Sequence, residues 1–214
     1  ETGQAFITVD EAGQNTILVY GGANMTLSAT DVEMSAEAFI GADFVVAQLE
    51  VPFEAIEQAF KIARKQNITT VLNPAPAIEL PKSLLELTDI IIPNETEAEL
   101  LTGISINNES DMKETATYFL DLGISAVLIT LGEQGTYCAY QEQYKMIPAC
   151  NVKAVDTTAA GDTFIGAFLS ELNKDLSNLE SAIRLANQAS SLTVQRKGAQ
   201  ASIPTRKEVE GEYN

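Results

Sequence analysis

The sequence predicts a single α/β domain, built on a doubly wound, mostly parallel sheet flanked by helices. From Phe44 onward, short apolar β-prone runs alternate with segments of helical periodicity, a pattern typical of βαβ units. With 214 residues, 45% of them hydrophobic, the chain can bury one substantial core. We therefore expect one domain over residues 1–214, with an α/β core at residues 23–214 and separate strands within residues 1–22.

Two strands joined by a hairpin loop are expected at the start of the chain. Residues 6–10 and 16–20 are apolar, β-prone runs, and the glycine-containing segment 11–15 lies between them. The clearest helix is predicted over residues 53–66, because apolar side chains recur along one face and Pro52 stands near its entrance. A hairpin therefore precedes the α/β pattern.

The strands of the core are short and are separated by helical or turn-forming segments. They are expected at residues 44–49, 70–72, 89–92, 126–130, 136–140 and 144–147. The last two are separated only by a Gln-Glu-Gln turn, which predicts an antiparallel edge of the sheet. Long helices then close the core, and residues 206–214 are expected to be peripheral.

Composition limits the classes of function. A net charge of −17 argues against a nucleic-acid backbone or an anionic membrane as the main partner, whereas MgATP brings its own counter-charge. Cys138 and Cys150 stand outside any Cys-x-x-Cys spacing, so neither a disulfide scaffold nor a structural zinc site is predicted. The apolar runs are too short to span a membrane and no secretory segment is recognisable, so we expect a cytoplasmic location.

The most informative motif is the run at residues 156–164, which leads into an apolar helical pattern. Ala159, Ala160 and Gly161 carry almost no side chain, so an anion could approach their N–H groups at a helix start. Asp162 follows directly, and because the chain has no histidine, its carboxylate is the candidate acceptor of a substrate proton. The alternative is that an aspartate of this run only caps the helix.

Further polar residues follow predicted strands, where α/β folds usually build ligand sites. Glu50 comes after the apolar run 44–49 and could accept hydrogen bonds from sugar hydroxyls, although a solvated glutamate also explains it. Asn94 and Glu97 have the spacing of a capping box, which requires no ligand. The glycine-bearing turn at residues 130–135 allows a nucleotide to approach, but it matches neither a Walker loop nor a Gly-x-Gly-x-x-Gly fingerprint.

Taken together, these motifs resemble the ribokinase-like (PfkB) family of carbohydrate kinases. Residues 156–164 are similar to the signature of the family, and other matches fall in the order and spacing of bacterial members, at residues 48–52, 72–77, 93–99, 129–132 and 196–200. The resemblance covers nearly the whole chain. The sequence begins at Glu1 without methionine and lacks the early Gly-Gly-Lys-Gly-x-Asn sugar-binding segment of the family, so we expect an N-terminally incomplete domain.

The resemblance implies ATP-dependent phosphorylation of a sugar, with D-ribose and its 5-hydroxyl as the expected acceptor. Asp162 would take the hydroxyl proton and, with Glu50, would bind the sugar. Amides from Ala159, Ala160 and Gly161 would stabilise charge on the transferred phosphoryl group. The residues that would line the ATP site are Asn94, Thr130, Leu131, Gly132, Glu133, Gln134, Gly135, Gly161 and Asn187.

The resemblance also implies two kinds of metal site. Magnesium would bridge the ATP phosphates near Asn94, with Glu97 contributing indirectly. A monovalent cation, expected to be K⁺ because hard oxygen ligands suit it, would order the loop of the anion hole. The matching positions, several of them through backbone carbonyls, are Asp156, Thr158, Thr193, Arg196, Gly198 and Ser202. A basic helix end followed by a C′ glycine also explains residues 196–198.

Other interpretations stay open on the sequence alone. The acceptor could be another sugar or a nucleoside, because much of acceptor recognition in the family lies in the segment that is absent here. The chain could instead bind nucleotide without catalysing transfer. By resemblance, the strands within residues 1–22 would form a lid over the sugar, through which two chains could pair as a homodimer, since unpaired strand edges favour association.

Overall fold

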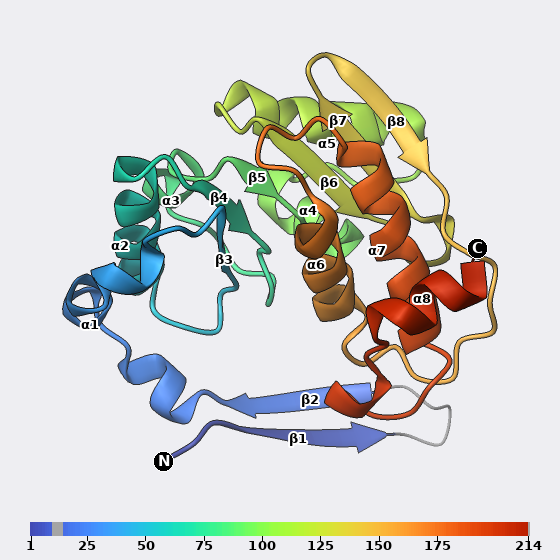
Figure 1. Ribbon diagram of the computed structural model, residues 1–214, viewed down its shortest axis with the longest axis horizontal. Helices are drawn as coiled ribbons and strands as arrows, with labels where there is room; N and C mark the ends of the chain where they lie inside the picture. Colours follow the sequence, from blue (N-terminus) through green and yellow to red (C-terminus); the bar gives the residue numbers. More distant parts are fainter. Residues whose placement is uncertain (10–14, 214) are drawn as a thin grey trace.

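A six-stranded sheet lies at the centre of the computed structural model, which describes residues 1–9 and 15–213 (Figure 1). The strand order follows the chain: β3 (Phe44–Ala47), β4 (Thr69–Leu72), β5 (Ile90–Ile91), β6 (Ala126–Thr130), β7 (Thr136–Tyr140) and β8 (Gln143–Ile147). Strands β3 to β6 pair in parallel, whereas β7 and β8 are antiparallel to their neighbours. The predicted mostly parallel sheet with an antiparallel edge is confirmed.

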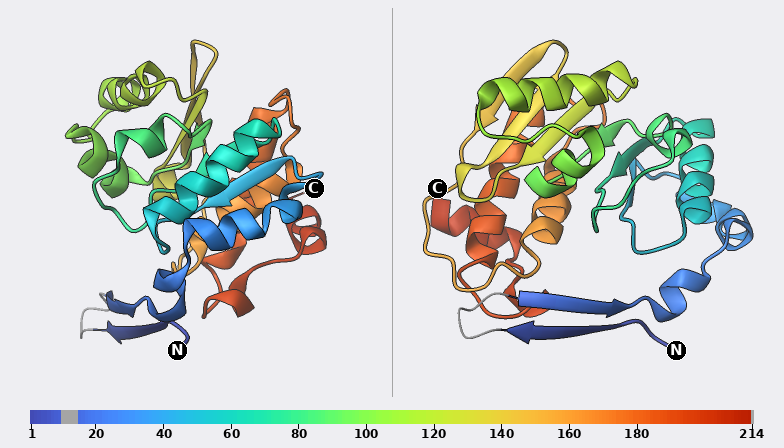
Figure 2. Two further views of the ribbon diagram at one scale, coloured as in Figure 1. Left: turned by 90° about the vertical axis from the view of Figure 1, so that its left-hand side faces the viewer. Right: turned by 180° about the vertical axis from the view of Figure 1, so that it is seen from behind.

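Helices cover both faces of this sheet (Figure 2). One face carries α2 (Phe53–Lys65), α3 (Lys82–Leu85), α4 (Glu95–Thr102) and α5 (Glu109–Asp121), and the other carries α6 (Ala160–Glu171) and α7 (Leu179–Thr193). The short helix α1 (Ala29–Met34) precedes β3, and α8 (Arg206–Tyr213) packs on α7. Within the described residues, no helix combines the length and apolarity needed to cross a membrane.

Successive side chains along a strand point to opposite faces of the sheet, so the core is divided into clusters beneath the two layers of helices. On β6, Ala126 and Leu128 face the cluster under α6 and α7, whereas Val127 and Ile129 face the cluster under α4 and α5. A strand buried on both faces needs apolar residues at every position, which explains why the run at residues 126–130 is continuously apolar until its last residue.

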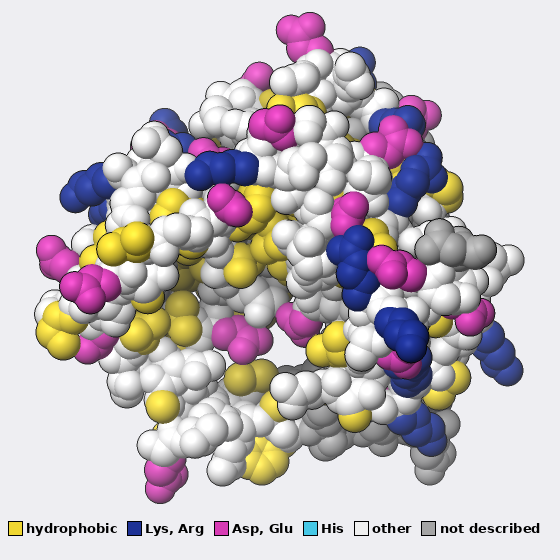
Figure 3. All heavy atoms as spheres, in the orientation of Figure 1, with side chains coloured by type: hydrophobic (Ala, Val, Ile, Leu, Met, Phe, Trp, Pro, Cys, Tyr) yellow, Lys and Arg dark blue, Asp and Glu magenta, His cyan; other side chains and the backbone are white. Residues whose placement is uncertain are grey.

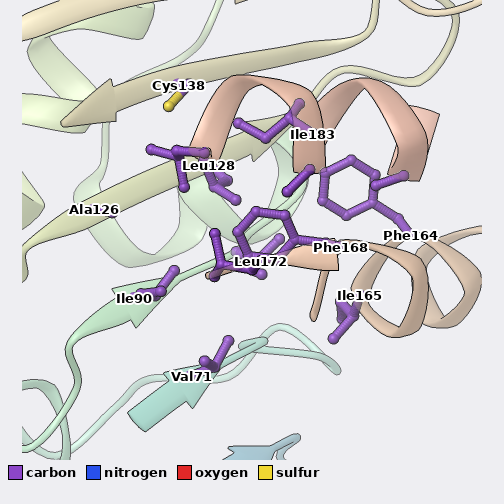
Figure 4. Packing of buried hydrophobic residues seen from close by; sticks show 14 of the residues in the cluster. Val71, Ile90, Ala126, Leu128, Cys138, Phe164, Ile165, Phe168, Leu172 and Ile183 are labelled. Atoms are coloured by element: carbon purple, nitrogen blue, oxygen red, sulfur yellow. The ribbon is translucent and has the colours of Figure 1, made fainter. Parts of the chain in front are cut away.

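Helix α6 is held on the sheet by aromatic side chains. The rings of Phe164 and Phe168 stack with centroids 6.2 Å apart, one helical turn from each other. Both belong to the cluster that includes Leu128 and Ile183, and Figure 4 shows their rings between the helix and the strands. The start of α6 is consequently fixed relative to the strand ends.

A two-stranded ribbon stands apart from the central sheet. Strands β1 (Gln4–Val9) and β2 (Asn15–Tyr20) pair antiparallel, from Gln4 opposite Tyr20 to Val9 opposite Asn15. The two predicted strands are confirmed over residues 6–9 and 16–20, while residue 10 of the first strand and residues 11–14 of the predicted loop lie outside the described residues. Figure 3 shows the surface hollowed between this ribbon and the rest of the molecule, with acidic side chains at the border.

Two details differ from the sequence prediction. Strand β5 is shorter than residues 89–92, although the ladder continues beyond it: Asp89 N–H donates to the Thr70 carbonyl and Ile92 N–H to the Leu72 carbonyl. Residues Arg206–Tyr213 of the segment predicted to be peripheral form the helix α8, in which Val209 is the buried residue among those whose burial is described, and it packs against α7. A mostly charged segment with one buried residue gives little periodic signal.

Candidate active site

A cavity of about 870 Å³ opens beside the carboxyl ends of the parallel strands. Parallel strands end at the same edge of a sheet, so polar residues that follow them meet there. Most of the predicted sugar and nucleotide residues line this cavity: Glu50, Asn94, Glu97, Thr130, Gly132, Glu133, Gln134, Gly135, Ala159, Ala160, Gly161, Asp162 and Asn187. Residues far apart in the sequence therefore share one site.

The start of α6 has the geometry of an anion-binding site. Ala159 is the N-cap residue and adopts a left-handed conformation with φ 62°, and the Ala160 N–H donates to the Thr157 carbonyl at 3.2 Å. In the described part of the chain, neither the Ala159 N–H nor the Gly161 N–H donates to a protein acceptor. A Cβ built on Gly161 would meet no atom within 4 Å, so open space lies beside this amide. Two of the three predicted amides thus remain available to a ligand.

Asp162 lies in the first turn of α6, on the cavity side. Its Oδ1 accepts a hydrogen bond from Gln48 Nε2 at 3.1 Å, and its side chain is exposed. The helix has no side-chain capping hydrogen bond at its N-terminus, so Asp162 does not act as a cap. An exposed carboxylate that faces a cavity at a helix start can accept a proton from a bound hydroxyl.

Asn94 and Glu97 form the predicted capping box at the start of α4. The Glu97 carboxylate accepts from Asn94 N–H at 2.8 Å and from Asn94 Nδ2 at 2.9 Å, while Asn94 Oδ1 accepts from Glu97 N–H at 2.8 Å. Burial raises the pKa of Glu97, and the hydrogen bond from the Asn94 N–H partly opposes this. Both oxygens of Glu97 are engaged, so it fixes the position of Asn94.

Oxygen groups that line the cavity could hold a magnesium ion that arrives with a nucleotide. Among the residues described, no group of three or more histidine, cysteine, aspartate or glutamate side chains is placed to hold a metal. Magnesium does not need such a cage, because it keeps several water ligands and is usually held by one or two protein oxygens together with phosphates.

The turn after β6 depends on glycine. Residues Gly132–Gln134 form a 3₁₀ turn, and Gly135 follows with φ 107°. A Cβ at Gly135 would lie 2.2 Å from the Ile147 carbonyl oxygen, so only glycine fits against the chain that leaves β8. Leu131, which was also predicted to line the ATP site, is buried in the core beneath the turn, and its N–H donates to the Gly135 carbonyl.

Asn187 connects α7 to the end of the antiparallel edge. Its Oδ1 accepts from Thr136 Oγ1 at 2.9 Å, and its Nδ2 donates to the carbonyls of Ile147 and Pro148 at 3.1 and 3.2 Å. The amide therefore has partners within the protein, and the side chain is buried. Asn187 therefore lines the cavity and holds in place the segment that follows β8.

The predicted cation positions lie outside the cavity lining, around Asp156. Its Oδ1 accepts from Thr158 N–H and its Oδ2 from Gly198 N–H, both at 3.0 Å, which links the segment before α6 to the segment after α7. Hydrogen bonding from Thr158, and then from the Gly198 N–H, lowers the pKa of Asp156 to about 2. This link is complete above about pH 4 and is lost as the pH falls toward 2.

The other predicted cation residues use their side chains within the protein. Thr193 Oγ1 donates to Thr163 Oγ1 at 3.0 Å, Arg196 pairs with Glu208 at 2.8 Å, and Ser202 Oγ donates to the Ala199 carbonyl at 2.6 Å. Backbone carbonyls, the remaining carboxylate lone pairs and the lone pairs of the hydroxyl oxygens could hold a cation here. Hard oxygen donors of this kind suit a potassium ion.

Several residues that line the cavity were not predicted as site residues, and two of them are amides at strand ends. Gln48 and Asn73 directly follow β3 and β4 and are hydrogen-bonded to each other, and Gln48 also donates to Asp162. Both appeared in the sequence only as parts of longer motifs. Their shared feature, a polar residue directly after a buried strand, is the signal that could have identified them.

The chain is similar to carbohydrate kinases over almost its whole length. Residues 1–206 match the model of the pfkB family carbohydrate kinases. A ribokinase of Staphylococcus aureus (strain COL) is 64% identical over 209 residues, which are 98% of this chain and 69% of that protein. A deoxyribokinase of Salmonella typhi is 36% identical, over 95% of this chain and 67% of that protein.

Solved structures agree with this similarity. The structure of the Arabidopsis thaliana ribokinase complexed with ribose and ATP matches with a TM-score of 0.87 and 33% identity, covering 98% of this chain and 68% of that one. The chain thus spans about two thirds of the length of these relatives. The sequence similarity and the shared fold lead to one conclusion: this chain belongs to the pfkB family of carbohydrate kinases.

Proposed function

We propose that the chain transfers the γ-phosphoryl group of ATP to the 5-hydroxyl of D-ribose, giving ADP and D-ribose 5-phosphate. The observation that carries this proposal is the start of α6, where Asp162 and the Gly161 N–H face the same cavity as Glu50 and the turn after β6. The ribokinase of Staphylococcus aureus supports D-ribose as the acceptor, because 64% of the 209 matched residues are identical in this chain.

The reaction requires one proton transfer and one phosphoryl transfer. Asp162 accepts the proton of the sugar hydroxyl as the hydroxyl oxygen forms a bond to the γ-phosphorus. The bond between that phosphorus and the oxygen bridging to ADP breaks, and ADP leaves with the electron pair. Charge on the transferred group is stabilised by the Gly161 N–H and the positive end of α6. Glu50 would hold the sugar through its hydroxyls.

Magnesium and potassium complete the proposal. Bound magnesium would supply positive charge to the phosphates, and Asn94, held in place by Glu97, is the residue that would organise it. A potassium ion beside Asp156 would brace the segment that leads into α6, since Asp156 already joins this segment to Gly198. The cytoplasmic location expected from the sequence stays a prediction.

Two alternatives are favoured by particular observations. The similarity to a deoxyribokinase makes deoxyribose the nearest competing acceptor. The second alternative is binding of nucleotide without transfer, which the Gly161 N–H and the turn after β6 could support without Asp162 acting as a base. A coupled assay of ADP release with MgATP, K⁺ and each sugar in turn separates these cases. Release that needs D-ribose supports the proposal, and ATP binding without sugar-dependent release contradicts it.

We also propose that the chain forms a homodimer through the ribbon of β1 and β2. Leu18, Val19 and Tyr20 of β2 are exposed, as is Phe6 of β1. A two-stranded ribbon with apolar side chains and unpaired edges is unstable alone and favours pairing with another strand.

The Asp162→Asn variant should lose at least about a hundredfold in turnover, because the amide cannot accept the hydroxyl proton. ATP binding, followed by calorimetry, should change little, since the fold and the Gly161 N–H are retained. Asp175→Asn, a change of the same kind in the loop before α7, should leave turnover unchanged. Wild-type turnover in Asp162→Asn would contradict the assignment of the base.

The Gly161→Ala variant should lower turnover by roughly a hundredfold, because its methyl group enters the space beside the amide and displaces the phosphoryl group. The fold should not suffer, since alanine is favoured over glycine in a helix by about 0.5–1 kcal/mol. Gly166→Ala is the matched control, in the same helix and with equally open space. Equal turnover in the two variants would show that no phosphoryl group lies against Gly161.

Turnover should rise severalfold when choline chloride is replaced by KCl at equal ionic strength, because the cation orders the loop before α6. This response should disappear in Asp156→Ala, which removes the acceptor of the Thr158 and Gly198 N–H groups. Asp175 also accepts a backbone N–H two residues on, so Asp175→Ala is the matched control and should keep the response. A potassium response that survives in Asp156→Ala would place the cation elsewhere.

Sedimentation equilibrium should give twice the 23.0 kDa mass of one chain. The Leu18→Lys change should yield monomers, because it introduces a charge on a side chain that is 70% exposed in the single chain and covered in the dimer. Leu100→Lys, on the exposed side of α4, should remain dimeric. A dimer that persists in Leu18→Lys would exclude the ribbon as the contact.

A further inference from the structure

A chain of hydrogen bonds ends at the Asp162 carboxylate. Asn73 Nδ2 donates to the Ile92 carbonyl at 2.8 Å, and Gln48 Nε2 donates to Asn73 Oδ1 at 2.7 Å and to Asp162 Oδ1 at 3.1 Å. These bonds connect the ends of β3, β4 and β5 to the first turn of α6, although Gln48 and Asp162 are 114 residues apart.

The Ile92 carbonyl determines which group donates in each of these hydrogen bonds. A backbone carbonyl can only accept, so Asn73 must turn its NH₂ group toward Ile92 and its oxygen toward Gln48. Gln48 must then present its own NH₂ group, whose two hydrogens match the two acceptors Asn73 Oδ1 and Asp162 Oδ1. The group of Gln48 that faces Asp162 is therefore its NH₂ donor.

Backbone hydrogen bonds hold the Asn73 end of this series of hydrogen bonds in place. Asn73 is only 9% exposed, its N–H donates to the Ala47 carbonyl at 3.0 Å, and its carbonyl accepts from Ala75 at 2.9 Å. The residue after Gln48, Leu49, is buried and donates to the Ala75 carbonyl at 2.8 Å. The backbone on both sides of the Gln48 and Asn73 contact is thus held by the sheet edge.

Asp162 has few other restraints. Its side chain is exposed, and among the described residues Gln48 is the one whose side chain donates a hydrogen bond to the Asp162 carboxylate. A carboxylate with one partner can rotate away when that partner is lost, and a general base must lie within hydrogen-bond reach of its proton. Oδ1 is engaged by Gln48, which leaves Oδ2 to the substrate hydroxyl.

We propose that Gln48, oriented by Asn73, is a positioning residue that holds the Asp162 carboxylate for proton transfer. This inference rests on the proposed phosphotransfer function. Loss of the donor should slow transfer while leaving nucleotide binding intact, because the amide contacts the base and not the turn that faces the nucleotide. A misplacement of the base by about 1 Å can cost as much as a hundredfold in rate.

The kinetic test compares two changes at Gln48 with a control elsewhere. Gln48→Leu removes the donor at nearly constant size, and Gln48→Glu keeps the shape but replaces the donor with an acceptor. Both should lower kcat by about tenfold or more, with the KM for ATP within about twofold of wild type and an unchanged thermal unfolding midpoint. Gln58→Leu, at a half-buried position of α2 outside the cavity, should leave kcat unchanged.

A double-mutant cycle separates positioning from general damage. If Gln48 acts through Asp162, Gln48→Leu should have no further effect on the residual turnover of Asp162→Asn. An equal loss in both backgrounds, or wild-type kcat in Gln48→Glu, would overturn the proposal. Asn73→Leu should reproduce the kinetic effect of Gln48→Leu, because it removes the group that orients the glutamine.

A second readout does not depend on activity. The side-chain NH₂ resonances of Gln48 in a ¹H–¹⁵N spectrum should shift, and their exchange with water should accelerate, in Asp162→Ala, whereas those of Gln58 should not change. Unchanged Gln48 resonances would overturn the inference even if the enzyme is active. Shifted resonances in a chain without sugar-dependent turnover would support the contact while contradicting the proposed function.

Discussion

The packing of α6 against the sheet is the constraint on which the site depends. Phe164 and Phe168 bury their stacked rings among strand and α7 side chains, so the helix cannot slide along the sheet without opening the core. Two polar contacts join its start to α7, from Ser190 to the Ala160 carbonyl and from Thr193 to Thr163. The position of Asp162 is thus determined by apolar packing within about two turns of it in the same helix.

The polar groups at the sheet edge serve two purposes. Some are completely engaged within the protein and shape the cavity, as the Asn187 amide and the Glu97 carboxylate are. Others keep capacity for a ligand, as do the Gly161 N–H and the exposed carboxylate of Asp162. This division follows from the cost of leaving buried polar groups unpaired, which restricts open hydrogen-bonding capacity to positions that face the cavity.

The sequence predicted the order of the elements well because hydrophobic periodicity is a local signal. It also placed the start of α6, where small residues precede Asp162. It did not predict that Gln48 contacts Asp162, because that contact joins segments more than a hundred residues apart and depends on the amide orientation of Asn73. Nor did it predict that Leu131 is buried beneath its turn, since a turn sequence does not reveal which side chains point inward.

The most direct test of this account is a crystal structure of the chain with magnesium, a non-hydrolysable ATP analogue and D-ribose. The account predicts that the terminal phosphoryl group lies within hydrogen-bond distance of the Gly161 N–H. It also predicts that the 5-hydroxyl of the sugar contacts the Asp162 carboxylate while Gln48 still donates to its other oxygen. A nucleotide bound away from the start of α6, or a sugar hydroxyl beyond the reach of Asp162, would contradict it.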